Sequence, residues 1–487
     1  MKYNWGIILL SFILVILSFS GCSKRKLGET VQDKTNQYDL NIVENDLGKN
    51  EKSKDLKSEL VKDQEDTIQE EAKQEEIDQI DLEQKDKNQE ALPQSVGKKD
   101  ENKKTEKKEV YNTMLKRSLV STGNTYRMKT AIEKAKQGEK VTIAYIGGSI
   151  TEGAGASSAS KSYAYQTYEY FKDTYGQGDG SNVSFVNAGM GGTPSTLGIL
   201  RYDRDVTEYG NIEPDIVFIE FAVNDYQEPT NGEAYESLVR KVLSSKNRPA
   251  VVLMFSVFQS KWNMQNLYIP VGEYYELPMI SIKDAVVPEL EEGRMTDALF
   301  FADQYHPTTY GHTIMANCIK NYFNAIDEME KHSEDITIPL EAKIGKAYEK
   351  IQMVDRSYKG DEIEIIPGGF SAFDEKIGRF MGNKPTFPEN WMKDKEQEDE
   401  KLIMNLNCKN LLIVYKASSD TSYGTAEIYV DSKLVMSIDG YQSGGWNNPI
   451  TVSLINEKIA DNHCVKIKMS KDSLDKSFTI LAFGYSK

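Results

Sequence analysis

The chain has 487 residues, too many for one ordinary domain and enough for two or three. Its 75 acidic residues outnumber the 59 basic ones, so the net charge is −16. This charge argues against nucleic acid as a main partner, because binding phosphates needs a basic surface. The four cysteines are too few for a disulfide framework.

The amino terminus carries an apolar run over residues 5–19. The run is shorter than the ~20 residues that a membrane-spanning helix needs, and it is typical of a secretory signal. It ends in Phe19-Ser20-Gly21-Cys22, which resembles the lipobox of bacterial lipoproteins. The resemblance implies that residues 1–22 are a lipoprotein signal peptide and that Cys22 is lipidated. The protein is then anchored to the extracytoplasmic face of the bacterial membrane. An ordinary secretory signal or an uncleaved anchor stays an alternative.

Almost half of the residues in segment 23–110 are charged, and Tyr38 is its only aromatic residue. Such a segment buries too little apolar area to offset its conformational entropy. We therefore predict a disordered tether or frayed helix that holds the later domains away from the membrane.

Residues 111–330 alternate short apolar runs with amphipathic stretches. The expected strands are Val141–Ile146, Val183–Asn187, Ile216–Val223, Ala250–Val257 and Met279–Ile282. The expected helices are Thr125–Gln137, Tyr163–Tyr175, Ser195–Thr207, Glu233–Ser245 and Thr309–Met329, with a weaker one at Lys283–Val287 that Pro288 ends. The expected strands are continuously apolar and do not alternate apolar with polar residues, and helices join them. This pattern predicts a three-layer α/β/α sandwich around a mainly parallel five-stranded sheet.

The ends of three of these strands carry reactive or turn-forming residues. Ser149 lies in Gly-Gly-Ser-Ile-Thr, Gly192 closes Gly-Met-Gly-Gly, and Asn224 follows the third strand. Asp303 and His306 lie far downstream in Asp-Gln-Tyr-His-Pro, just before the last helix. Because sites in such sheets form at the carboxyl ends of strands, these residues are expected to meet.

A serine hydroxyl is a poor nucleophile until a base removes its proton, and histidine is suited to this at neutral pH. Of the four histidines, only His306 has an acid three residues earlier and a proline after it. Asp303 can then orient the imidazole, although a role as a helix cap only, with a Ser149–His306 dyad, stays open. His312 is expected to be structural.

The four blocks in this order resemble the SGNH hydrolase (GDSL esterase) family, in its GGSIT-type subgroup, over residues 138–328. The resemblance implies a flavodoxin-like fold and a catalytic Ser149. It also implies an oxyanion hole made of the N–H groups of Ser149 and Gly192 and the amide of Asn224, with Gly191 or Gly189 as alternatives to Gly192. No cofactor and no metal are expected, since neither HExxH nor a paired CxxC is present.

Two charged groups within this domain have less clear roles. Arg201 and its charged neighbours are expected to form a salt-bridged helix surface. Glu220 lies in a strand that otherwise reads as buried, so it is expected to pair with a cation or to cap a loop.

Residues 345–487 contain short alternating strands separated by turn signals. They are Leu411–Lys416, Ala426–Val430, Leu434–Ile438, Ile450–Leu454, Cys464–Met469 and Phe478–Phe483. This spacing predicts an antiparallel, jelly-roll-like β-sandwich. Trp446, Tyr441 and Trp391 are candidates for sugar contact, or they are packing residues. Cys408 and Cys464 are candidates for a disulfide.

The sequence therefore predicts an extracytoplasmic serine esterase that acts on short-chain, acetyl-type esters of carbohydrate. Its partners are an acylated carbohydrate or another small ester, and the membrane through the lipid anchor. An O-acetyltransferase would use the same serine and histidine and stays an alternative. A lipase or thioesterase, and a non-catalytic polysaccharide-binding lipoprotein, also stay open.

Overall fold

The computed structural model describes residues 97–226, 228–378 and 385–487. The predicted signal peptide, Cys22 and most of the predicted tether lie outside these residues. The end of the tether segment is helical, because α2 runs over Gly97–Ser118. In the described part of the chain, no helix is long and apolar enough to cross a membrane.

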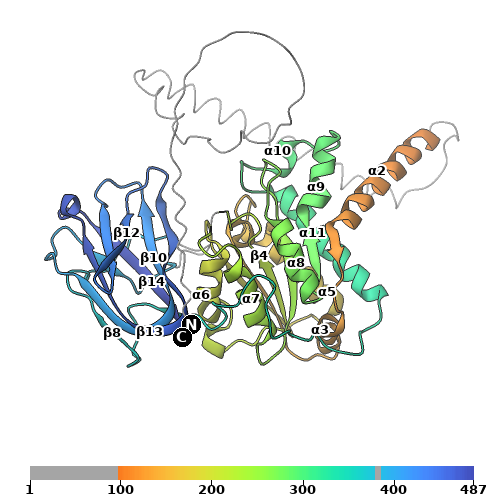
Figure 1. Cartoon of the computed structure of the whole chain (residues 1–487). Coiled ribbons are helices and arrows are strands. Elements are labelled where there is room, and N and C mark those ends of the chain that lie inside the picture. Colours follow the sequence, from red (N-terminus) through yellow and green to blue (C-terminus); the bar gives the residue numbers. More distant parts are fainter. Residues whose placement is uncertain (1–96, 227, 379–384) are drawn as a thin grey trace, which may run out of the picture. The chain divides into compact units, whose positions relative to one another are not determined.

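A six-stranded sheet forms the centre of the first domain, in the order β1-β6-β5-β4-β2-β3 (Figure 1). Its five parallel strands are β2 (Val141–Gly147), β3 (Val183–Gly189), β4 (Ile216–Glu220), β5 (Ala250–Phe255) and β6 (Met279–Ser281). The prediction of a mainly parallel sheet is confirmed. The sixth strand, β1 (Leu119–Ser121), pairs antiparallel with β6 at the edge, and its three half-buried residues are too few to give a periodic signal.

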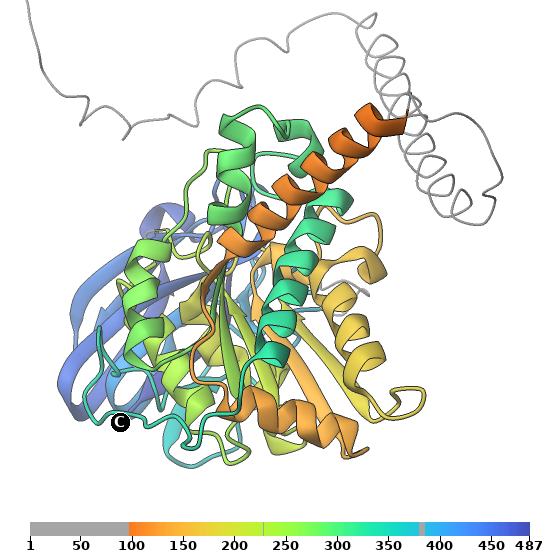
Figure 2. The same cartoon turned by 90° about the vertical axis from the view of Figure 1, so that its right-hand side faces the viewer.

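Helices cover both faces of this sheet. Successive side chains of a strand point to opposite faces, so continuously apolar strands make both faces apolar, and both need a covering layer. Ile143 packs in one core and Ala144 in the other. Figure 2 looks onto the face covered by α2, α5 (Tyr163–Tyr175) and α11 (Thr309–Glu328), where α3 (Tyr126–Lys136) and α9 (Ile282–Glu291) also pack. The other face carries α6 (Ser195–Asp205), α7 (Glu233–Leu243) and α8 (Gln265–Tyr274). Two short helices, α4 (Ser149–Glu152) and α10 (Asp297–Phe300), complete the domain.

Helix α9 continues through Pro288, where the sequence predicts an end. A proline in a helix leaves the carbonyl four residues earlier without its usual donor. Here that carbonyl belongs to Asp284, and the Nε of Arg117 donates to it at 3.2 Å. A second donor group of Arg117 reaches the carbonyl of Ala285 at 3.1 Å. The Arg117 side chain from α2 therefore supplies hydrogen-bond donors to the carbonyls next to Pro288.

The second domain is an antiparallel β-sheet domain of eight strands, and the all-antiparallel prediction is confirmed. Its strands are β7 (Gln352–Val354), β8 (Ile363–Ile366), β9 (Trp391–Lys393), β10 (Leu402–Ser418), β11 (Thr425–Val430), β12 (Lys433–Asp439), β13 (Trp446–Met469) and β14 (Phe478–Ser486). The two strands predicted at Ile450–Leu454 and Cys464–Met469 are parts of the single long strand β13. Cys408 and Cys464 are both free thiols.

The two domains share a core within the unit Gly97–Lys487. The second half of β10 is buried on both faces: Ile413 points into the β-domain core, whereas Leu412 and Val414 pack with the α6–α7 side of the first domain. At Gly484, a Cβ atom would lie 2.2 Å from Leu200 of α6, so only glycine permits this close approach. The shared core fixes the β domain against the end of the sheet that carries the candidate site.

Candidate active site

Ser149 lies at the carboxyl end of β2, where the chain turns into α4. Gly148, just before the serine, leaves room for the Asn224 side chain, because a Cβ on Gly148 would lie 2.2 Å from the Oδ1 of Asn224. After one helical turn, Gly153 ends α4 with a φ of 112°, a backbone conformation that glycine adopts without strain. The two glycines thus hold Ser149 on a sharp bend beside Asn224.

The structure brings together Ser149, His306 and Asp303. The Nε2 of His306 is 2.9 Å from the Oγ of Ser149, and its Nδ1 is 2.8 Å from the Oδ2 of Asp303. An ionised carboxylate only accepts hydrogen bonds, so Nδ1–H donates to Asp303 and Nε2 is left to accept the serine proton. This tautomer allows His306 to act as a general base toward Ser149.

Asp303 does not cap the helix that follows it, because the N-cap of α11 is Thr308. Its Oδ1 accepts the N–H groups of Tyr305 at 2.7 Å and of His306 at 2.9 Å, which folds the loop around the carboxylate. Partial burial raises the pKa of Asp303, but the hydrogen bonds from the His306 ring and the backbone outweigh this, so its pKa lies below the usual value. Asp303 therefore stays ionised beside the imidazole.

The glycine-rich loop after β3 resolves which N–H is available for an oxyanion. The N–H of Gly189 donates to the Oδ1 of Asn187 at 2.9 Å, and that of Gly191 donates to the Oε2 of Glu152 at 2.8 Å. Among the described residues, no hydrogen bond uses the N–H of Gly192, which sits on a backbone with φ of 66°. Of the three predicted candidates, only Gly192 offers a free donor.

Ser149 and Asn224 supply the other two predicted donors. The N–H of Ser149 belongs to the first turn of α4, where backbone donors have no intrahelical partner. The Asn224 side chain packs over Gly148, directly beside Ser149. The structure thus leaves the N–H groups of Ser149 and Gly192 available as donors and places the Asn224 side chain beside the serine turn, which is compatible with the predicted oxyanion hole.

Arg201 does not lie on a helix surface, which corrects the sequence-based expectation. Its side chain is fully buried, and it donates to the carbonyl of Ala188 at 2.6 Å and to that of Gly147 at 2.9 Å. Its ion pair with Asp205 spans 3.2 Å. Arg201 thus ties together the ends of the two strands that lead to Ser149 and Gly192. The sequence does not predict this role, because the carbonyls that Arg201 binds belong to strands that are distant in the chain.

Glu220 and Asp225 are buried carboxyl groups at the end of β4. Within the described residues Glu220 forms no ion pair: its Oε2 accepts from the hydroxyl of Thr151 at 3.1 Å, and burial raises its pKa to about 7. Asp225 accepts the N–H of Ser195 at 2.6 Å, and burial raises its pKa to about 7 as well. The first group supports the turn after Ser149, and the second fixes the start of α6.

His312 has the structural role that the sequence predicts. Its Nδ1 accepts the N–H of Tyr163 at 3.2 Å, and its Nε2 donates to the carbonyl of Ala154 at 3.0 Å. Burial lowers the pKa of this buried ring to about 4, so it stays neutral. A Cβ on Gly155 would lie 2.0 Å from the carbonyl of Pro307, so this loop presses against the one that carries His306.

Of the three aromatic residues predicted for sugar contact, the structure brings only Trp446 to the site. A Cβ on Gly192 would lie 2.8 Å from the Cζ2 of Trp446, whose side chain is 55% exposed. Trp391 is buried in the β-domain core against Phe483, so it contacts no ligand. Tyr441 lines a separate hollow of the β domain with Asp439 and Lys476.

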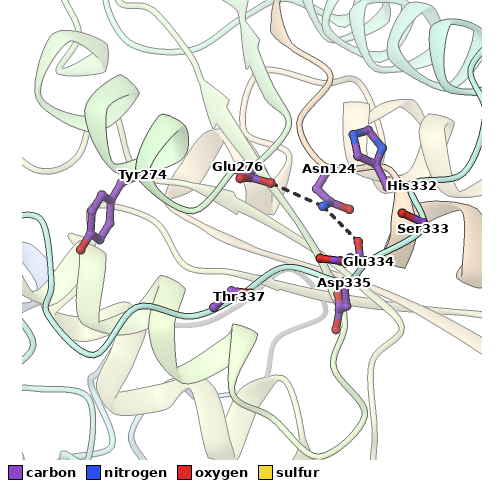
Figure 3. A pocket seen from close by; sticks show the side chains of 8 residues that line it. All are labelled: Asn124, Tyr274, Glu276, His332, Ser333, Glu334, Asp335 and Thr337. Atoms are coloured by element: carbon purple, nitrogen blue, oxygen red, sulfur yellow. Dashed lines mark hydrogen bonds between the residues drawn. The ribbon is translucent and has the colours of Figure 1, made fainter.

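Figure 3 shows a different hollow, lined by Asn124, Glu276, His332 and their neighbours. Its residues precede α3 and β6 or follow α11, so it lies at the amino edge of the sheet, away from Ser149. Asn124 donates there to Glu276 and to the carbonyl of Glu334. The hollow contains none of the predicted site residues. In the described ranges, no cluster of three or more His, Cys, Asp or Glu side chains is arranged to hold a metal ion.

Comparisons with known proteins agree with this geometry. Residues 145–314 match the model of the GDSL-like Lipase/Acylhydrolase family. A two-domain esterase active on acetylated mannans is similar over 77% of this chain and 98% of its own, with 27% identity and a TM-score of 0.67. Its structure with mannopentaose matches over the same shares, with a TM-score of 0.66. No curated protein matches the chain in sequence.

The fold, the site and these similarities define an ester hydrolase. More particularly, residues 145–314 are similar to the GDSL-like lipase/acylhydrolase family, and a β domain follows them, as in the similar two-domain esterase.

Proposed function

We propose that the protein is an extracytoplasmic serine esterase that removes acetyl groups from carbohydrate. The observation that carries the proposal is the hydrogen-bonded series Ser149–His306–Asp303 next to the unused N–H of Gly192. A nucleophile, its base, an orienting acid and an oxyanion donor are the parts that acyl transfer requires.

In the first half of the reaction, the Oγ of Ser149 attacks the ester carbonyl and its proton passes to the Nε2 of His306. The oxyanion of the tetrahedral intermediate accepts hydrogen bonds from Ser149, Gly192 and Asn224. The C–O bond to the sugar then breaks, His306 gives its proton to the departing sugar oxygen, and an acetyl-serine remains.

In the second half, water attacks the acetyl-serine while His306 takes one of its protons. The new tetrahedral intermediate collapses as its C–O bond to Ser149 breaks, His306 returns the proton to the Oγ of Ser149, and the acetic acid released gives its remaining proton to water to become acetate. Asp303 stabilises the imidazolium that forms in each half, because its lowered pKa keeps it ionised.

A carbohydrate substrate is supported by Trp446 and by the structural similarity. The β domain places the exposed ring of Trp446 over Gly192, within reach of a group whose ester lies at Ser149. Aromatic rings offer a large flat contact area at little entropic cost, which suits the apolar face of a sugar. The similar two-domain esterase acts on acetylated mannans.

The proposed location follows from the sequence. The lipobox-like Phe19-Ser20-Gly21-Cys22 and the charged segment after it fit an enzyme tethered at the outer face of the membrane. Labelling of the expressed protein with a radioactive fatty acid, lost in Cys22→Ala, would support this anchor. Labelling that survives the substitution would contradict it.

Acetate release from acetylated mannan by the parent and by Ser149→Ala tests the activity. We expect release by the parent and a loss of at least ~10³-fold in the variant, with p-nitrophenyl acetate as a second substrate. Ser157→Ala, which changes an exposed serine in a loop after α4, is the control. Equal rates in the parent and Ser149→Ala would remove Ser149 as the nucleophile. Hydrolysis of p-nitrophenyl acetate without release of acetate from the polysaccharide would refute the proposed carbohydrate substrate but not the proposed serine esterase.

A further inference from the structure

Four aromatic side chains form a continuous surface beside His306, which we call the aromatic platform: Tyr226, Trp262, Phe258 and Tyr305. The ring centroids of Tyr226 and Trp262 are 5.4 Å apart, those of Trp262 and Phe258 are 6.2 Å apart, and those of Phe258 and Tyr305 are 5.2 Å apart. The ring of Tyr305 lies 6.2 Å from that of His306. The platform therefore begins at the catalytic imidazole and extends away from it.

The platform is built by three loops at the carboxyl end of the sheet. Tyr226 follows β4, Phe258 and Trp262 follow β5, and Tyr305 belongs to the loop before α11. None of the four side chains is fully buried, and Tyr226 and Tyr305 are 59% and 54% exposed. Phe258 also packs against the core of the first domain, but packing does not explain why Tyr226 and Tyr305 stay more than half exposed, and exposed aromatic patches of this kind mark binding surfaces.

Backbone and buried side chains hold these loops in place. The N–H of Phe258 donates to the carbonyl of Trp262 at 3.2 Å and closes a tight turn. The buried Asn263 donates to the carbonyl of Ser256 at 2.8 Å, which anchors the next residue of that turn. The N–H of Gln259 donates to the carbonyl of Gln304 at 3.2 Å and joins this turn to the loop of His306. The rings are thus presented in a fixed arrangement before any ligand binds.

We propose that the aromatic platform binds sugar residues next to the acetylated one, so that the enzyme acts within a chain of sugars. The proposal rests on the proposed function and names where its substrate extends. Trp446 lies against Gly192, and Tyr305 of the platform lies beside His306, which is hydrogen-bonded to Ser149. A chain whose ester lies at Ser149 would then contact aromatic rings on both sides.

The exposure of the rings favours sugars over an acyl chain as the occupant. An acyl chain gains from an enclosed apolar pocket, whereas a ring that stays more than half exposed can cover only one face of its ligand. A pyranose has one apolar face and a rim of hydroxyl groups, which matches this open surface. The exposed amide side chain of Gln304 lies next to Tyr305 in the same loop and can meet hydroxyl groups at the rim.

The test compares the full-length parent with Trp262→Ala on two substrates. For acetylated mannopentaose, we expect KM to rise about tenfold, which corresponds to the loss of about 1.4 kcal/mol of aromatic contact. For p-nitrophenyl acetate, which has no sugar chain, kcat/KM should change less than about twofold, because the catalytic groups are untouched. Trp262→Phe, which keeps a ring, should recover most of the affinity. Unchanged KM for the oligosaccharide, or an equal loss on both substrates, would overturn the proposal.

Two further variants separate binding from folding and from catalysis. Tyr226→Ala removes an exposed ring of the platform and should also weaken binding of the oligosaccharide. Tyr209 is an exposed tyrosine outside the platform, so Tyr209→Ala should leave this binding unchanged. Binding of unacetylated mannopentaose to Ser149→Ala, with and without Trp262→Ala, needs no hydrolysis. A Kd that rises about tenfold supports the platform even if the proposed deacetylation fails, and an unchanged Kd refutes it.

Discussion

Arg201→Met is the variant that most directly tests how the fold holds the site. The substitution keeps a side chain of similar length but removes the buried charge. The carbonyls of Gly147 and Ala188 then lose a charged donor, and Asp205 keeps only Arg204, whose Nε lies 2.5 Å from its Oδ1. Because Gly147 leads to Ser149, the loss reaches the nucleophile through the backbone.

The expected loss of stability follows from these contacts. A hydrogen bond from a charged group contributes about 1.5–3 kcal/mol, and a buried acceptor left without a donor costs about 1–3 kcal/mol. Gly147 retains one donor, since its carbonyl also accepts the N–H of Met190 at 3.0 Å, so we expect a loss of about 3 kcal/mol in total. For a unit of roughly 390 residues that unfolds together, this corresponds to a fall of about 4 °C in Tm.

Thermal unfolding and p-nitrophenyl acetate hydrolysis measure the two effects in the same preparation. We expect kcat to fall ~10- to 100-fold at a temperature where the variant is folded, because small displacements of catalytic groups are costly. Arg204→Met is the matched control, since it removes an ion pair with Asp205 but touches neither strand carbonyl. If Arg201→Met behaves like Arg204→Met in both Tm and kcat, Arg201 does not position the site.

Three other substitutions test separate parts of the site. Gly192→Ala keeps the backbone N–H but would place a Cβ 2.8 Å from the Trp446 ring on a backbone with φ of 66°, so we expect the donor to be displaced and kcat on p-nitrophenyl acetate to fall ~10²–10³-fold; an unchanged kcat would show that the reaction does not depend on this backbone conformation. Asp303→Asn should lower kcat by up to ~10⁴-fold because the amide favours the wrong imidazole tautomer, and a loss below about tenfold would favour a dyad without Asp303. Glu220 has a folded pKa of about 7, above its usual value, so the stability linked to its protonation is present below about pH 4 and lost as the pH rises through 7. Glu220→Gln should therefore gain stability relative to the parent between about pH 5 and pH 8, by up to roughly 3 kcal/mol; a difference in Tm that does not change with pH would show that Glu220 does not titrate there.

Local signals were enough to predict the parallel sheet and to predict that the candidate site residues lie at one edge of it. Buried parallel strands read as continuous apolar runs, so β2 to β6 were expected within a few residues of their bounds. Helix α5 was expected at its observed bounds, Tyr163–Tyr175, where the hydroxyl of Ser162 accepts the N–H of Tyr165. Ser149 and His306 are 157 positions apart, yet topology brings both to the carboxyl edge of the sheet, and their chemical types identified them.

Other features depend on partners that are distant in the chain. Arg201 reads as a surface charge on an amphipathic helix, but its guanidinium reaches carbonyls on two strands. Trp391 reads as a possible ligand contact, but the β-domain core covers it. The sequence does not predict the aromatic platform, because its four rings come from three loops and no spacing in the sequence connects them.

By itself, then, the sequence determined the order of elements and the groups that can carry out acyl transfer, because each depends on local periodicity or on a side chain's own chemistry. Only the tertiary structure decided which N–H is free to bind an oxyanion, because that depends on which acceptors the loops bring to Gly189 and Gly191. It also decided that Trp446 of the β domain lies over Gly192. That placement results from a core shared by two domains, so no local sequence pattern can predict it.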